Sequence, residues 1–146
     1  MQRPPYDELG GDAFFVALVD AFYRRVDTDP VLRPMYPEDL TQSRHWLAVF
    51  LGQYFGGPQA YSEAKGHPRL RMRHVHLAIG RAERDAWYDA MHAAVDELGV
   101  AEPLRSAMLE YFDRSADWMI NTEDTPAEPT RTVHLGTKPD PTPEPS

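Results

Sequence analysis

The chain has 146 residues, 26% of them charged, with a formal net charge of −8 and no cysteine. The absence of cysteine excludes disulfides, iron–sulfur clusters on cysteine and thiolate chemistry, and the acidic balance argues against nucleic acid as a partner because phosphate binding needs a basic surface. The longest apolar run, residues 14–19, is too short to span a bilayer, so we expect no membrane span and a cytoplasmic location.

The length is that of one domain, but the folded part is predicted to be shorter than the chain. Six of the 14 prolines lie between Pro126 and Pro145, in a segment with almost no apolar content. Such a composition favours disorder. We therefore predict a folded domain over residues 1–122 and a disordered, proline-rich tail over residues 123–146.

Gly10, Gly11 and Asp12 offer a break in the chain and an N-cap for the first long helix. The apolar residues that follow have the spacing of one helical face. They are Phe15, Leu18, Val19, Phe22 and Val26.

A turn region follows, because Pro30, Pro34 and Pro37 interrupt any helix there. The second long helix should begin near Asp39 or Thr41 and end at the sequence Gly-Gly-Pro, residues 56–58. Its predicted inner face consists of Leu40, Ser43, Leu47, Phe50, Leu51 and Tyr54. Residues 61–67 are predicted to form a loop.

Three more helices are predicted in the second half of the chain. Pro68 can start a short helix over residues 70–75. Gly80 and Gly99 bound a long helix, and Pro103 opens the last one. The predicted inner faces of these two are Trp87, Met91, Ala94, Val95 and Leu98, then Leu104, Ala107, Met108, Tyr111, Phe112, Ser115 and Met119. No alternating strand pattern of useful length occurs, so the fold class is all-α.

The segment of residues 66–77 concentrates the residues best suited to chemistry. It carries three histidines and three arginines among apolar residues. A neutral imidazole can ligate a metal, but a lone histidine on a helix is more often a surface residue, and spacing alone favours His74 and His76 equally. No zinc or di-iron spacing occurs.

Three aromatic residues have polar groups that can act as hydrogen-bond donors. Tyr23 flanks the apolar face of the first helix, Tyr36 lies among the prolines, and Trp87 lies on the inner face of a later helix. Each is ordinarily a core or anchoring residue, and each would donate to a bound ligand if buried beside one. His45 and His92 lie off the inner faces, so we expect them at the surface.

Read in order, several segments resemble the group II truncated haemoglobins from about residue 6 to residue 120. They are Tyr6-Asp7 with Gly10-Gly11, Phe22-Tyr23, Val31-Leu32-Arg33, Tyr36-Pro37-Glu38-Asp39, Gln53-Tyr54-Phe55-Gly56-Gly57-Pro58, Tyr61-Ser62-Glu63, His67 to His74, and Glu83-Arg84-Asp85-Ala86-Trp87. Any one segment is a weak signal. Their shared order and spacing make the resemblance specific.

The resemblance implies a two-over-two helical globin that holds haem b noncovalently. His74 matches the iron ligand, and Tyr23, Tyr36 and Trp87 match the residues that hydrogen-bond the iron-bound ligand. The other implied haem-pocket residues are Leu47 over the iron, Ser43 at the gate, Arg73 and Tyr61 at the propionates, Trp46 at the haem edge, and Phe50 and Leu70.

The function implied is reversible binding of dioxygen and other diatomic ligands with slow release. The same donors make peroxidase-like or nitric oxide and oxygen redox chemistry plausible, with electrons from a separate, unidentified reductase. A monomer and a homodimer both agree with the sequence. The alternative is a cofactor-free helical interaction or regulatory domain that uses its tyrosines and tryptophans as core. A gas or redox sensor is disfavoured because no output domain is attached.

Overall fold

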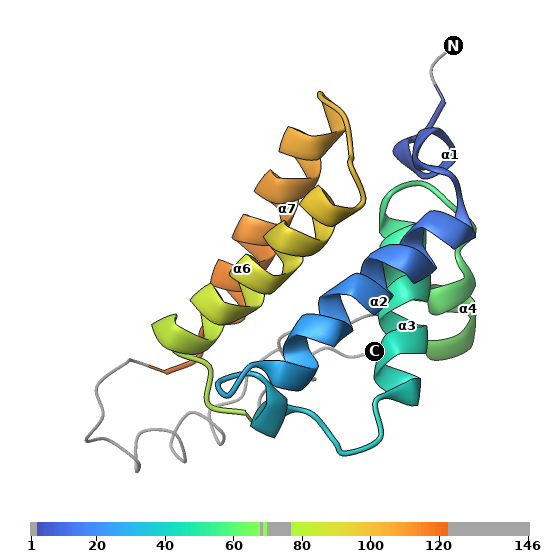
Figure 1. Ribbon diagram of the computed structural model, residues 1–146. Coiled ribbons are helices and arrows are strands. Elements are labelled where there is room, and N and C mark those ends of the chain that lie inside the picture. Colours follow the sequence, from blue (N-terminus) through green and yellow to red (C-terminus); the bar gives the residue numbers. More distant parts are fainter. Residues whose placement is uncertain (1–2, 68, 70–76, 123–146) are drawn as a thin grey trace.

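Helices form all the regular structure in the part of the chain that the computed structural model describes, residues 3–67, 69 and 77–122. They are α1 (Pro5–Leu9), α2 (Asp12–Thr28), the short 3-10 helix η1 (Arg33–Met35), α3 (Thr41–Tyr54), α4 (Ala60–Lys65), α6 (Arg81–Glu97) and α7 (Leu104–Trp118) (Figure 1). The all-α prediction is confirmed. No helix in the described ranges is long and apolar enough to cross a membrane.

Four of these helices form two stacked pairs. Helix α2 packs against α3 and against α6, and α6 packs against α7. Helices α2 and α3 form one pair, and α6 and α7 form the other. Within each pair the two helices run in opposite directions, and the pairs lie one over the other (Figure 1). This is the predicted two-over-two arrangement.

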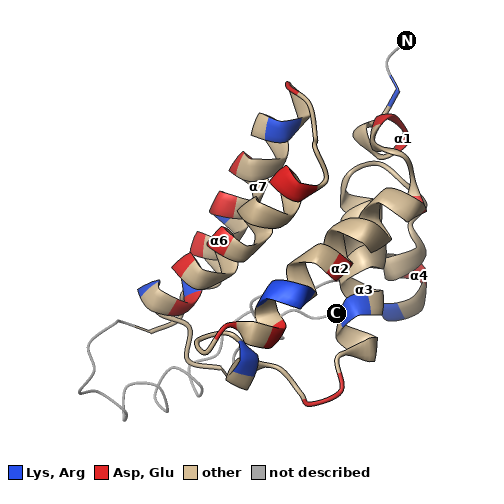
Figure 2. Cartoon of the chain, in the orientation of Figure 1, with Lys and Arg blue, Asp and Glu red and all other residues tan. Residues whose placement is uncertain are grey.

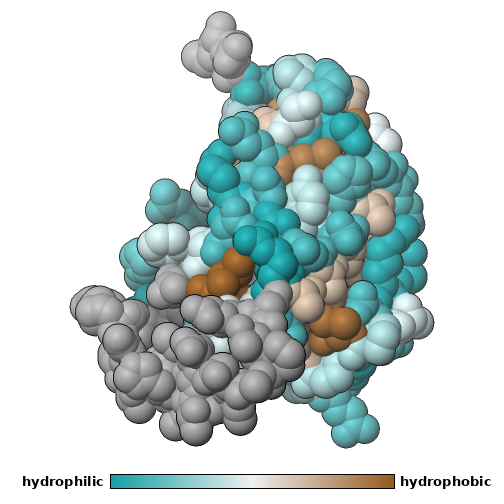
Figure 3. Space-filling model, turned by 90° about the vertical axis from the view of Figure 1, so that its left-hand side faces the viewer, coloured by the Kyte–Doolittle hydropathy of each residue, from teal (hydrophilic) through white to brown (hydrophobic). Residues whose placement is uncertain are grey.

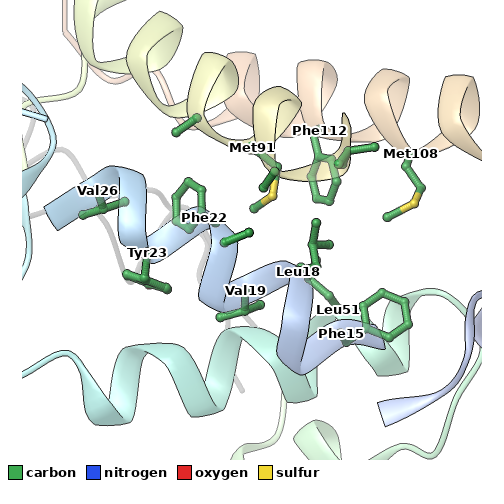
Figure 4. Close-up of a cluster of buried hydrophobic side chains, with 14 of the residues drawn as sticks. Phe15, Leu18, Val19, Phe22, Tyr23, Val26, Leu51, Met91, Met108 and Phe112 are labelled. Carbon is green, nitrogen blue, oxygen red and sulfur yellow. The ribbon is translucent and has the colours of Figure 1, made fainter. Parts of the chain in front are cut away.

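The core lies between the pairs and is built on α2. Its predicted apolar residues are fully buried, with Phe15 1% and both Leu18 and Phe22 0% exposed. Figure 4 shows Met91 of α6 and Phe112 of α7 facing this side of α2. Burying a side chain of this size stabilises the fold by about 1.5–3 kcal/mol, so one helical face accounts for much of the packing energy.

Two predictions about local structure are wrong. Residues 61–67 were expected to form a loop, but α4 covers most of them. The Gln53 amide explains this helix, because its Oε1 accepts from the Ser62 N–H at 2.9 Å and its Nε2 donates to Ser62 Oγ at 2.8 Å. The second error concerns the inner faces of two helices. Tyr54 was placed on the inner face of α3 but is 49% exposed, and Ala107 was placed on the inner face of α7 but is also exposed. The short helix predicted over residues 70–75 lies outside the described residues.

Apolar surface is limited on the face of the molecule that Figure 3 presents. Most of that face is hydrophilic, and the apolar residues form small, separate patches. Among the described residues, the large hydrophobic side chains that remain exposed are Val16, Val31, Tyr54 and Trp118.

The packing of α1 on the end of α3 gives a matched pair of stability predictions. The Tyr6 ring stacks on Phe15 with centroids 5.9 Å apart, and its hydroxyl donates to Asp12 Oδ1 at 2.6 Å. A Cβ on Gly57 would lie 2.5 Å from Tyr6 Cδ1, whereas a Cβ on Gly52 would lie 3.4 Å from Tyr6 Cε1. An alanine at position 57 therefore requires the Tyr6 ring to move, whereas an alanine at position 52 does not.

We therefore expect Gly57→Ala to lower the free energy of unfolding by about 1–3 kcal/mol, as overpacking does. Gly52→Ala should be neutral or stabilising by up to about 1 kcal/mol, because alanine is the better helix former. Urea unfolding followed by circular dichroism measures both. Equal effects of the two substitutions would contradict the proposed role of the Tyr6 ring.

Candidate functional site

A cavity of about 340 Å³ lies between the two helix pairs. Its volume is in the range of small-molecule sites, which are concave, mostly apolar and provided with a few polar groups. The apolar part of the described wall comes mainly from α3, α7 and the segment before α6. It includes Leu47, Phe50, Leu51, Leu77, Ile79, Phe112 and Met119.

The polar part of the wall brings together the three predicted donors. Tyr23 comes from α2, Tyr36 from the residue after η1, and Trp87 from α6, and all three line the cavity. The rings of Tyr23 and Tyr36 are in edge-to-face contact, with centroids 5.5 Å apart. Residues separated by up to 64 positions in the sequence thus share one wall.

These donors interact with one another. Burial raises the pKa of the Tyr23 hydroxyl to about 12, and hydrogen bonding with Ser43 and Tyr36 opposes part of that rise. Burial also raises the pKa of Tyr36, while hydrogen bonding with Trp87 lowers it. An indole N–H can only donate, so Trp87 donates to Tyr36. Both phenols are therefore neutral and able to donate at physiological pH.

Backbone contacts fix the turn that carries Tyr36. The Arg33 guanidinium donates to the carbonyl oxygens of Pro37 at 3.0 Å and Glu38 at 2.9 Å. Asp29 Oδ1 accepts from the backbone N–H of Val31 at 2.8 Å, which closes the turn after α2. Side chains thus position Tyr36 where regular secondary structure is absent.

The raised pKa of Tyr23 predicts a loss of stability at high pH. A folded-state pKa of about 12 against 10.0 for a free tyrosine means that the unfolded chain loses this proton first. The stability that this difference in the Tyr23 pKa contributes is therefore fully present below about pH 10. As the pH rises from about 10 toward 12, the free energy of unfolding loses up to about 3 kcal/mol. Unfolding free energies measured from pH 8 to 12 should fall less steeply in Tyr23→Phe than in the wild type. If the free energy of unfolding fell equally steeply with pH in both proteins, the raised pKa of Tyr23 would be contradicted.

The remaining predicted residues divide into three groups. Ser43, Leu47 and Phe50 line the cavity. Tyr61 is buried behind Phe50, with ring centroids 5.5 Å apart, and Trp46 lies beyond Tyr61 at 5.9 Å. The Trp46 indole donates to Gln42 Oε1 at 3.1 Å, and Lys65 Nζ lies 4.8 Å from the centre of its ring. Leu70, Arg73 and His74 lie outside the described residues.

Arg84 also borders the cavity, but its charge is used within the fold. Its side chain is 10% exposed, its Nε donates to Asp117 Oδ1 at 2.7 Å, and its other nitrogens pair with Asp85 and Asp113. It ties α6 to α7. The carboxylates that balance its charge are therefore those of the protein itself.

Sequence reasoning missed part of the wall. Leu77 and Ile79 line the cavity from a segment with no helical periodicity, so no pattern marked them. Asn121 fixes that segment: its Oδ1 accepts from the Ile79 N–H at 2.9 Å and its Nδ2 donates to the Leu77 carbonyl oxygen at 2.8 Å. The contact joins residues 42 positions apart, which no local signal predicts.

The donor set and the wall suit a flat, largely apolar cofactor with a polar ligand on one side. Three donors line one wall of the cavity, while most of the remaining described wall is hydrocarbon. An apolar wall accommodates a porphyrin ring, and donors beside it suit a small ligand on the iron. The fold and the cavity together define a truncated, two-over-two globin.

Comparison with known proteins gives the family. The bacterial-like globin model matches residues 5–121. Group 2 truncated hemoglobin YjbI of Bacillus subtilis is 38% identical over 117 residues, which are 80% of this chain and 88% of that protein. The chain therefore belongs to the bacterial-like globins and, among them, to the group 2 truncated haemoglobins, whose cofactor is haem.

Solved structures agree with this assignment. The hemoglobin of Chloroflexus aurantiacus is 51% identical, with a TM-score of 0.81, and the match covers 82% of this chain and 99% of that one. The group II truncated hemoglobin of Bacillus anthracis is 37% identical, with a TM-score of 0.83, and the match covers 88% and 98%. Membership in a haem-binding family rules against the cofactor-free alternative.

Proposed function

We propose that this globin binds dioxygen and releases it slowly. The observation that carries the proposal is the meeting of Tyr23, Tyr36 and Trp87 on one wall of the cavity. Haem iron supplies the binding of a diatomic ligand and passes electron density to it. Neutral donors in a buried site stabilise the negative charge that such a ligand gains, by about 1.5–3 kcal/mol for each hydrogen bond to a charged group.

The iron ligand in this proposal is His74. Leu77 lines the cavity, and three residues of extended chain span at most about 11 Å, so the cavity is within reach of His74. The bonds from Asn121 to Leu77 and Ile79 anchor the chain on the C-terminal side of this histidine. Arg73 is proposed to pair with a propionate, with Leu70 beside the ring.

The family match to residues 5–121 supports the division into a domain of residues 1–122 and a tail of 123–146.

A redox activity on peroxide or nitric oxide is the second candidate. The donors that stabilise a charged dioxygen also polarise a peroxide. We propose that electrons come from a separate reductase in the cytoplasm.

The sequence agrees with both a monomer and a homodimer, and sedimentation of the purified globin measures its oligomeric state.

Visible absorption spectra test the proposed ligand binding. The purified protein, or the apoprotein after addition of haem, is measured in the ferric state, after reduction, and with carbon monoxide. We expect an intense Soret band that shifts at each step, followed by an oxygenated form that persists in air. A reduced protein that oxidises at once in air and never yields an oxygenated spectrum would contradict the proposal.

A further inference from the structure

Tyr54 is the exposed tyrosine of this chain, and it lies in an unusual place. It is the last residue of α3 and is 49% exposed. Its ring stacks on the ring of Tyr111 from α7, with centroids 4.0 Å apart and 21° between the planes. At that separation the two ring faces are in van der Waals contact. A surface phenol is thus stacked directly on a more buried one.

Tyr111 connects this surface position to the cavity. It is partly buried and lines the cavity. Its ring also contacts Phe112, with centroids 5.4 Å apart, and Phe112 contacts Trp87 at 5.9 Å. A continuous run of aromatic rings therefore leads from Trp87 to the surface at Tyr54. The packing of the core needs these rings but does not need a phenol at the exposed end.

Tyrosine and tryptophan are the side chains that give up a single electron most readily among those in this run. A phenol that loses an electron also loses its proton. Tyr54 is half exposed, so water can take that proton, whereas burial raises the pKa of Tyr111, which hydrogen-bonds with Ser115. Oxidation that begins in the cavity is therefore expected to settle at the exposed ring.

We propose that Tyr54 is a surface oxidation site at which a small phenolic reductant is oxidised, with Tyr111 as the relay from the cavity. The inference rests on the proposed reaction of the haem-loaded protein with hydrogen peroxide. The reaction is balanced. Two phenol molecules each lose one electron and one proton, and one hydrogen peroxide molecule takes up these two electrons and two protons and becomes two water molecules. Tyr54 is oxidised and then reduced again for each phenol.

The charge of the protein sets the class of reductant. The net charge is −8, and acidic side chains are numerous along α6 and α7, as Figure 2 shows. Near Tyr111 on the same helix, Arg114 pairs with Glu110 at 3.3 Å, so its positive charge is partly balanced. A protein with a large negative charge repels anions. The expected reductant is a neutral or cationic phenol.

The test locates the oxidised residue. The haem-loaded globin is treated with hydrogen peroxide and a nitroso spin trap, and the trapped adducts are mapped on peptides by mass spectrometry. We expect an adduct on Tyr54 in the wild type and its loss in Tyr54→Phe. Tyr111→Phe should also lose the Tyr54 adduct, although Tyr54 remains exposed. In both variants a phenol added in place of the trap is oxidised more slowly.

Tyr88→Phe is the matched control. Tyr88 lies on α6 with its ring against His92 and Arg84, and it is not among the residues that line the described cavity, so its removal should leave the Tyr54 adduct unchanged. An adduct on Tyr54 that persists in a folded Tyr111→Phe overturns the relay. Peroxide consumption without any Tyr54 adduct in the wild type overturns this inference and leaves the proposed peroxide chemistry standing. Absence of peroxide consumption overturns both.

Discussion

Replacing Trp87 by phenylalanine is expected to speed dioxygen release by about tenfold to a hundredfold. The indole N–H is one of three donors on the cavity wall, and losing a hydrogen bond to a charged group costs about 1.5–3 kcal/mol, with about 1.4 kcal/mol for each factor of ten. Phenylalanine preserves the ring contacts with Phe22 at 5.6 Å and Phe112 at 5.9 Å. Stopped-flow displacement of dioxygen by carbon monoxide measures the rate.

Trp118→Phe is the control for this experiment. Trp118 is 63% exposed at the end of α7, so its removal should not alter the rate. Because Trp87 also interacts with Tyr36, the single variants and the double variant with Tyr36→Phe should be compared. Non-additive effects would show that the two donors act as a unit. An unchanged release rate in Trp87→Phe would remove Trp87 from the proposed function.

Hydrophobic periodicity predicted the long helices because each buries one continuous face. Helix α2 begins in the predicted segment, although Gly11 and not Asp12 is its N-cap residue, and its five predicted core positions are at most 1% exposed. The short elements lack such a face and depend on distant contacts. Helix α1 is held by the Tyr6 N–H, which donates to the Phe55 carbonyl oxygen at 2.8 Å. A sequence pattern contains no sign of that bond.

Part of the candidate site could be predicted from the sequence, and part depends on how the helices pack. The order of motifs placed Tyr23, Tyr36 and Trp87 together, and the structure brings them to one wall. Periodicity assigned Tyr54 to a buried face, but Leu51 and Phe55 supply the core contacts at this end of α3, and the Tyr54 ring is left half exposed. Its contact with Tyr111 depends on how α3 and α7 pack, which neither helix specifies alone.

His74→Ala is expected to have the largest effect of any substitution, the loss of stably bound haem. Changing an outer-shell partner of a metal site costs about 10–100-fold in affinity, and removing the ligand itself should cost at least as much. The purified variant should therefore show a weak Soret band, and added haem should pass rapidly to an excess of apomyoglobin. The wild type should retain its haem under the same conditions.

His76→Ala decides between the two histidines that spacing alone left equal. If His74 is the ligand, His76→Ala keeps its haem, and imidazole added to His74→Ala fills the vacated position and restores much of the Soret intensity. Rescue by imidazole separates a ligand from a residue that only holds the fold, because a free imidazole supplies the nitrogen but not the packing. If His76→Ala lost its haem and His74→Ala retained it, the iron ligand would be His76 and not His74.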